Sequence, residues 1–66
     1  MTISLNGERS DVRGASTVAE LIDAYQLPAS ALLIEHNGIA LHRREWTEKI
    51  LAEGDQIELI RVVAGG

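Results

Sequence analysis

The sequence contains no cysteine. Disulfide bridges, thiolate metal sites, iron–sulfur clusters and a cysteine nucleophile are therefore excluded, and any sulfur chemistry must use sulfur supplied from elsewhere. Basic residues are also few, because six Lys and Arg stand against ten Asp and Glu, giving a net charge of −4. Nucleic-acid binding relies on clustered cations, so we expect no nucleic-acid partner and favour partners with basic surfaces.

Long apolar runs are missing as well. No run reaches the roughly 18 residues of a membrane span, and residues 1–5 lack the charged start and apolar core of a signal peptide. We therefore expect a cytoplasmic protein with no membrane partner. The 66 residues, 45% of them hydrophobic, are enough for one globular domain over residues 1–66. A chain this short buries only about 60% of its unfolded surface, so a deep catalytic pocket is not expected.

The first third of the chain predicts a hairpin. Residues 1–5 alternate apolar and polar side chains, which is the pattern of a half-buried strand. Asn6-Gly7 is a strong signal for a tight turn, so a second strand should return over residues 8–13 with Val12 as its buried anchor.

A helix is predicted next. Thr17 and Glu20 have the spacing of a capping box, in which each side chain accepts a hydrogen bond from a backbone N–H that the helix leaves unpaired. The helix should end near Leu27, before Pro28. Its apolar stripe at helical spacing consists of Val18, Leu21, Ile22 and Tyr25.

The second half predicts more strands. We expect strands over residues 32–35 and 39–41 joined by an Asn37-Gly38 turn, and a final strand over residues 56–63 after a turn at residues 53–55. Residues 43–52, which include Trp46, Ile50 and Leu51, predict a short helical turn or loop over one end of the core. The fold class is therefore α+β, with one main helix on a mixed sheet of four to five strands.

Catalytic and metal-binding motifs are weak. His36 and His42 have no specified nucleophile and no compact ligand spacing, so we interpret both as partly exposed polar residues. Glu53 and Asp55 are explained by the turn that contains them. We expect this chain to bind no cofactor and no metal and not to be an enzyme.

The final strand and the residues after it carry the clearest functional signal. Ile57 and Leu59 are predicted to face inward, which turns Ile60 and Val62 outward, where they could dock a partner together with Val63. The alternative is that both faces are covered or that the strand twists. Ala64, Gly65 and Gly66 follow as a tail that we expect to be flexible, and the two glycines place an unhindered carboxylate at Gly66. The alternative is an ordinary frayed terminus.

These features together resemble the ubiquitin-like β-grasp sulfur carriers, and most closely the ThiS family of thiamine biosynthesis. The resemblance covers nearly the whole chain. Its markers are residues 5–8, the helix start at 17–21, the Asn37-Gly38 turn, Glu45-Trp46, residues 51–58, and residues 62–66 with the terminal Gly-Gly. It implies a β-grasp fold and a protein that serves partner enzymes as a co-substrate.

The resemblance also implies a mechanism. A partner activating enzyme would use ATP and Mg²⁺ to adenylate the Gly66 carboxylate, and a persulfide relay fed by a cysteine desulfurase would convert it to a thiocarboxylate. A thiazole synthase would then take the sulfur. Because the sequence ends at Gly66, we expect no processing protease. One alternative, the small subunit of molybdopterin synthase, has the same tail chemistry but a different acceptor. A second, a ubiquitin-like protein modifier, would form isopeptide conjugates on lysines instead of a thiocarboxylate. A plain β-grasp interaction module would not need the tail.

Overall fold

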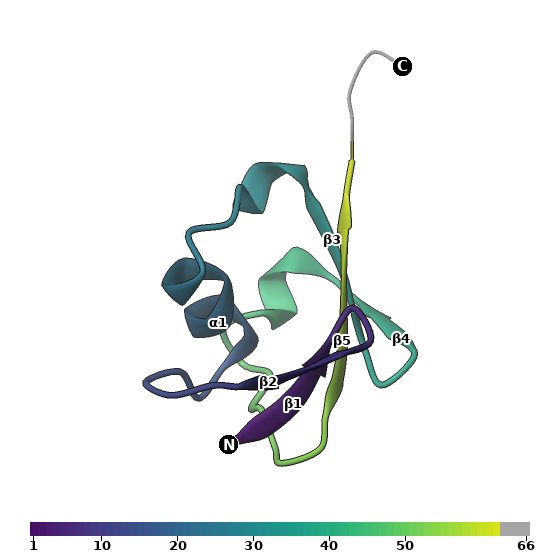
Figure 1. Ribbon diagram of the computed structural model, residues 1–66. Helices are drawn as coiled ribbons and strands as arrows, with labels where there is room; N and C mark the ends of the chain where they lie inside the picture. Colours follow the sequence, from purple (N-terminus) through teal and green to yellow (C-terminus); the bar gives the residue numbers. More distant parts are fainter. Residues whose placement is uncertain (63–66) are drawn as a thin grey trace.

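The computed structural model describes residues 1–62, and residues 63–66 lie outside the described part. One mixed sheet has the strand order β2-β1-β5-β3-β4, and helix α1 covers one of its faces (Figure 1). The parallel pair is β1 with β5, and the other pairs are antiparallel. The elements are β1 (Thr2–Leu5), β2 (Glu8–Asp11), α1 (Val18–Ala24), the 3₁₀ turn η1 (Ala29–Ala31), β3 (Leu32–His36), β4 (Ile39–Leu41), the 3₁₀ turn η2 (Arg43–Glu45) and β5 (Gln56–Arg61). The predicted α+β class is confirmed with five strands.

The first hairpin forms as predicted. Asn6 and Gly7 both have positive φ, 51° and 81°, as the turn that matches the twist of a two-residue hairpin requires. Strand β2 ends at Asp11, two residues earlier than the predicted range. Val12 is nevertheless buried, and its N–H donates to the Met1 carbonyl at 2.7 Å.

Helix α1 begins with the predicted capping box. The Thr17 hydroxyl accepts from the Glu20 N–H at 3.1 Å, and the Glu20 carboxylate accepts from the Thr17 N–H at 3.1 Å. The helix ends at Ala24, earlier than predicted, and Gln26 takes a left-handed φ of 54°. Tyr25 is consequently 45% exposed, so its expected place in the apolar stripe is wrong. Leu27 packs against the core after the chain has turned.

The segment between β4 and β5 closes one end of the core. Trp46 and Leu51 are buried there, in agreement with the predicted short turn over the core. Ile50 is 64% exposed and forms an isolated bridge with Thr17 through the backbone, so its expected role in that cover is wrong. Ile50 is exposed although the next residue, Leu51, is buried, because successive side chains on an extended backbone point to opposite sides.

The core lies between α1 and the inner face of the sheet. Its largest fully buried side chains are Ile3, Leu21, Ile34, Ile57 and Val18. Three strands and the helix contribute to this set, so β5 is held at the centre of the sheet by packing as well as by pairing. No helix within residues 1–62 is long and apolar enough to cross a membrane.

Candidate functional site

Strand β5 presents two different faces. Ile57 is fully buried and Leu59 packs against the core, whereas Ile60 and Val62 are 45% and 47% exposed. The predicted inward and outward orientations on this strand therefore agree with the structure. Helix α1 covers one face of the sheet (Figure 1). Because side chains alternate along a strand and Ile57 faces the core, Ile60 and Val62 belong to the opposite, uncovered face.

A residue on β3 extends this exposed surface. Leu33 pairs directly with Ile60 across the antiparallel β3–β5 ladder and is 57% exposed. Side chains directly opposite each other in such a ladder lie on the same face, with Cβ atoms about 5 Å apart. We call Leu33, Ile60 and Val62 the outer patch. The sequence analysis does not name Leu33 as a site residue, although strand alternation turns it outward between buried Leu32 and Ile34.

Two asparagines hold β5 from opposite sides. The Asn6 side-chain oxygen accepts from the Leu59 N–H at 2.7 Å, and the Asn37 side-chain oxygen accepts from the Gln56 N–H at 2.7 Å. Both asparagines occupy the left-handed first position of an Asn-Gly turn, with φ of 51°. Each turn therefore joins its own hairpin and also ties that hairpin to the central strand.

The start of β5 is anchored by the buried carboxylate of Asp55. One oxygen of Asp55 lies 2.8 Å from His36 Nε2 and accepts from the Ala52 N–H at 2.8 Å, and the other accepts from the Asn37 side-chain amide at 3.1 Å. Burial raises the pKa of Asp55, but these hydrogen bonds from His36, Ala52 and Asn37 outweigh it and hold the pKa below its ordinary value. The cluster has a structural role, because its hydrogen bonds all end on Asp55 and so fix the turn that begins β5.

Strand β5 is longer than its parallel neighbour. Strand β1 pairs with β5 only at Ser4 with Gln56 and at Leu5 with Ile57, whereas β3 accompanies β5 as far as Arg61. In Figure 1 the yellow end of β5 rises beyond β1 and β2. The predicted site residues Val63, Ala64, Gly65 and Gly66 follow directly in the chain and lie outside the described residues.

Elsewhere on the surface of residues 1–62, the side chains considered as catalytic or metal-binding candidates do not come together. A hollow of about 290 Å³ near the start of β5 includes Arg9 and Glu53 in its lining, but neither histidine, so no imidazole base meets a hydroxyl there. The His36 ring is hydrogen-bonded to Asp55 through Nε2. Within residues 1–62, no three His, Asp or Glu side chains converge on a possible metal position.

The fold defines a class. A mixed sheet with a parallel central pair, packed on one helix entered from a hairpin, is the ubiquitin-like β-grasp arrangement. Comparison with known proteins is more specific. The ThiS family model matches residues 3–66, and the chain therefore belongs to the ThiS family, the sulfur carriers of thiamine biosynthesis.

Two individual relatives bear the ThiS name, and a third is uncharacterized. The chain is 30% identical over 66 residues to the sulfur carrier protein ThiS of Escherichia coli, and the match covers 100% of both chains. The crystal structure of the thiamine biosynthesis protein ThiS from Geobacter metallireducens superposes with a TM-score of 0.86 at 32% identity, covering 100% of both chains. An uncharacterized protein, ycf40, from Trieres chinensis is 23% identical over 65 residues, covering 98% of this chain and 89% of that protein.

Proposed function

We propose that this sulfur carrier bears its sulfur as a thiocarboxylate on Gly66 and acts as a co-substrate of partner enzymes in thiazole formation. The observation that supports the proposal is the family match, which extends over residues 3–66 and so includes the Gly-Gly end. The long β5 strand, anchored through Asn6, Asn37 and Asp55, is a rigid base from which that end departs.

The chemistry requires activation, since a free carboxylate is a poor acyl electrophile. In the proposed first step a Gly66 carboxylate oxygen attacks the α-phosphate of Mg²⁺-bound ATP on the activating enzyme, and pyrophosphate leaves. The terminal sulfur of a donor persulfide, supplied by a cysteine desulfurase, then attacks the acyl carbon and displaces AMP. A second thiol attacks the donor cysteine's sulfur in the resulting acyl disulfide, so that a disulfide forms with the donor and the thiocarboxylate leaves. Thiazole synthase is the proposed acceptor of the sulfur.

Glycine at both terminal positions suits this chemistry. Gly65 and Gly66 have no Cβ to clash in a narrow channel, and Ala64 adds only a methyl group. From Val62 to Gly66 the chain spans at most about 13 Å when fully extended. A partner that engages the outer patch can therefore hold the carboxylate only within that radius, so docking limits where the reaction occurs.

The outer patch is the proposed docking surface. Leu33 and Ile60 form a cross-strand apolar pair on the uncovered face of the sheet, and Val62 continues it toward the tail. Exposed apolar groups gathered on one face of a small domain mark an interaction surface. Val63, which lies outside the described residues, completes the proposed partner-binding set.

Intact-mass spectrometry tests the proposed chemistry. The purified chain is incubated with the activating enzyme of its own organism, ATP, Mg²⁺ and a persulfide donor, and the mass of the C-terminal peptide is measured. We expect an exchange of oxygen for sulfur located on Gly66. Deletion of Gly66 should abolish the exchange and Gly66→Ala should slow it. Normal exchange in the deletion variant, or no ATP consumption with the wild-type chain, contradicts the proposal.

The same sample separates the two related functions. Thiocarboxylate that is consumed by thiazole synthase supports the thiamine branch, whereas consumption by the large subunit of molybdopterin synthase alone moves the chain to the molybdenum-cofactor branch. A protein modifier would instead produce isopeptide conjugates on lysines of other proteins, which appear as branched peptides after digestion.

A further inference from the structure

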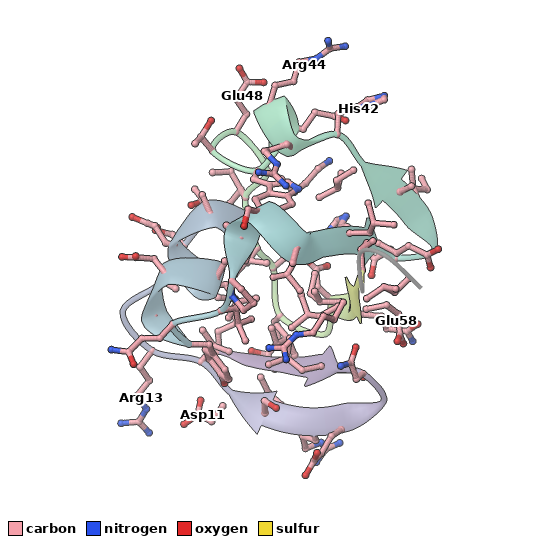
Figure 2. All side chains as sticks on the ribbon, turned by 90° about the horizontal axis from the view of Figure 1, so that it is seen from above. Asp11, Arg13, His42, Arg44, Glu48 and Glu58 are labelled. Atoms are coloured by element: carbon pink, nitrogen blue, oxygen red, sulfur yellow. The ribbon has the colours of Figure 1, made fainter. Side chains whose placement is uncertain are left out.

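Two carboxylates lie directly opposite each other beside the outer patch. Glu35 of β3 pairs with Glu58 of β5 in the same ladder that pairs Leu33 with Ile60. Positions two apart on a strand share a face, so Glu35 and Glu58 project from the same uncovered face as the outer patch. Figure 2 shows Glu58 at the right of the view, on the side of the molecule away from α1.

No cation of the described chain neutralises this pair. The ion pairs within residues 1–62 involve Asp11 and Asp55, and neither Glu35 nor Glu58 takes part in one. On its other side Glu35 is paired with Ala40, which is uncharged and small. Strand β1 ends its pairing with β5 at Leu5 opposite Ile57, one position before Glu58. Beyond Leu5 the Asn6 side chain bonds this edge of β5. Glu58 is exposed and Glu35 is half-buried, so a group from another molecule can approach the pair from the uncovered face of the sheet.

The arrangement opposes stability. Like charges directly opposite each other in a ladder are destabilising, and a small domain has little stability in reserve. Positions where a sequence breaks a local rule without a gain in the isolated fold are expected at functional sites. The repulsion between Glu35 and Glu58 is relieved when one cation sits between them.

We infer that Glu35 and Glu58 together receive an arginine side chain of the activating enzyme, next to an apolar surface of that enzyme that covers Leu33, Ile60 and Val62. This inference rests on the proposed function and adds the chemistry of the partner to it. A guanidinium has five N–H donors in a planar fork and can donate to both carboxylates at once. The carrier's net charge of −4 favours approach of a basic surface, and the mixture of an apolar centre with a charged edge is the usual anatomy of a protein interface.

The position of the pair predicts which kinetic constant it controls. Glu58 lies within the extended strand β5 and Gly66 is eight positions further along the chain. The strand alone carries the chain about 10 Å from Glu58 to Arg61. In the proposed complex a cation at Glu58 therefore contacts the docked domain, and the tail presents the reacting atoms. The cation can strengthen and orient docking, so its loss should raise the KM of the activating enzyme for the carrier and leave kcat nearly unchanged.

The test uses the double variant Glu35→Gln/Glu58→Gln, which keeps the shape of both side chains and removes both charges. Glu48→Gln is the matched control, because Glu48 lies in the turn after η2 and is drawn at the upper left of Figure 2, far from the right-hand position of Glu58. Formation of pyrophosphate by the activating enzyme is measured against carrier concentration at low ionic strength and again near 0.5 M salt, where charges beyond a few ångströms are screened.

We expect the double variant to raise KM about tenfold at low ionic strength with kcat changed by less than about twofold. The wild-type KM should rise with salt, and the variant's should depend on salt much less. Glu48→Gln should behave as wild type. In thermal unfolding of the carrier alone, the double variant should melt a few degrees higher than wild type, since the repulsion has been removed.

Each other outcome overturns the inference in a distinguishable way. If the double variant keeps the wild-type KM while Ile60→Asp raises it, the face docks the enzyme without an arginine between the carboxylates. If sedimentation shows a dimer that the double variant alters, the occupant is a second copy of the chain. If the wild-type carrier supports no pyrophosphate formation, the proposed function fails and the inference fails with it.

Discussion

The side-chain oxygen of Asn6 accepts a hydrogen bond from the backbone N–H of Leu59 at 2.7 Å. The two residues are 53 positions apart in the chain. Asn6 thus does two things at once, because its left-handed backbone, with φ of 51°, also makes the turn between β1 and β2. The β1–β5 pairing ends at Leu5 and Ile57. Beyond that point the Asn6 side chain, in place of a strand backbone, hydrogen-bonds the edge of β5.

Replacing Asn6 separates these two contributions. Asn6→Gly retains the left-handed turn but loses the acceptor, and we expect a loss of about 1 kcal/mol in the free energy of unfolding. Asn6→Ala also loses the acceptor and keeps a Cβ at positive φ, a conformation that alanine tolerates less well than asparagine or glycine. It should therefore cost about 1 kcal/mol more than Asn6→Gly. Urea denaturation monitored by circular dichroism measures both. If Asn6→Gly unfolds at the wild-type midpoint, the hydrogen bond to Leu59 contributes nothing to stability.

Asn37 provides the corresponding test on the other side of β5. Its side chain also accepts from a β5 N–H, that of Gln56, and in addition donates to Asp55. Asn37→Gly therefore removes two hydrogen bonds and retains the turn. We expect it to lower the free energy of unfolding by about 2 kcal/mol, more than Asn6→Gly. Equal losses in the two variants would show that the donation to Asp55 adds nothing.

The Asn-Gly turns show which features of the fold can be predicted from the sequence and which cannot. Both were predictable because the dipeptide favours positive φ wherever it occurs. The hydrogen bonds from their side chains to β5 were not predictable, because they depend on which strand the fold brings alongside each turn. The same holds for the outer patch: alternation indicated that Ile60 and Val62 face outward, whereas the pairing of Leu33 with Ile60 and of Glu35 with Glu58 requires the register of two strands that are distant in the chain.

The predictions that Tyr25 and Ile50 belong to the apolar packing are wrong for local structural reasons. Tyr25 has the spacing of the helix stripe, but the helix ends at Ala24, and residues past its end no longer follow the helical period. Ile50 is as apolar as its buried neighbour Leu51, and its exposure follows from the backbone bridge to Thr17. Composition alone does not distinguish these positions.

Asp55 predicts a pH dependence of stability. Its carboxylate has a pKa below the ordinary value of 3.8 in the folded state, so the folded protein favours the ionised form. This contribution is fully present above the ordinary pKa and is lost as the pH falls through the lower pKa of the folded state. Asp55→Asn should therefore be less stable than wild type at pH 7, and the difference should shrink as the pH falls below 3.8. Urea unfolding at several pH values measures this, and a difference that stays constant down to the acid end contradicts it.

The capping box of α1 predicts that the domain loses stability when the Thr17 hydroxyl is removed. Thr17→Ala removes the hydroxyl that accepts from the Glu20 N–H and should lower the free energy of unfolding by about 1 kcal/mol. Thr47 is exposed and lies in the turn after η2, outside any cap of α1, so Thr47→Ala is the matched control and should change stability by less than about 0.5 kcal/mol. Equal effects of the two substitutions would mean that the Thr17 hydroxyl does not cap the helix.

The two faces of β5 predict opposite results for one substitution at two positions. Ile57→Asp places a charge in the fully buried core and should leave the domain unfolded. Ile60→Asp places the same charge on the exposed outer patch, so the far-ultraviolet circular dichroism spectrum should be unchanged and the melting temperature should fall by only a few degrees.

If the patch docks the activating enzyme, Ile60→Asp should raise KM about thirtyfold, which corresponds to about 2 kcal/mol for a side chain at the centre of an interface. Leu33→Asp, on the neighbouring strand, should do the same through its pairing with Ile60. An Ile60→Asp protein that is folded and activated with the wild-type KM would remove the outer patch from the docking surface, and an unfolded one would show that the uncovered face of β5 contributes to the core.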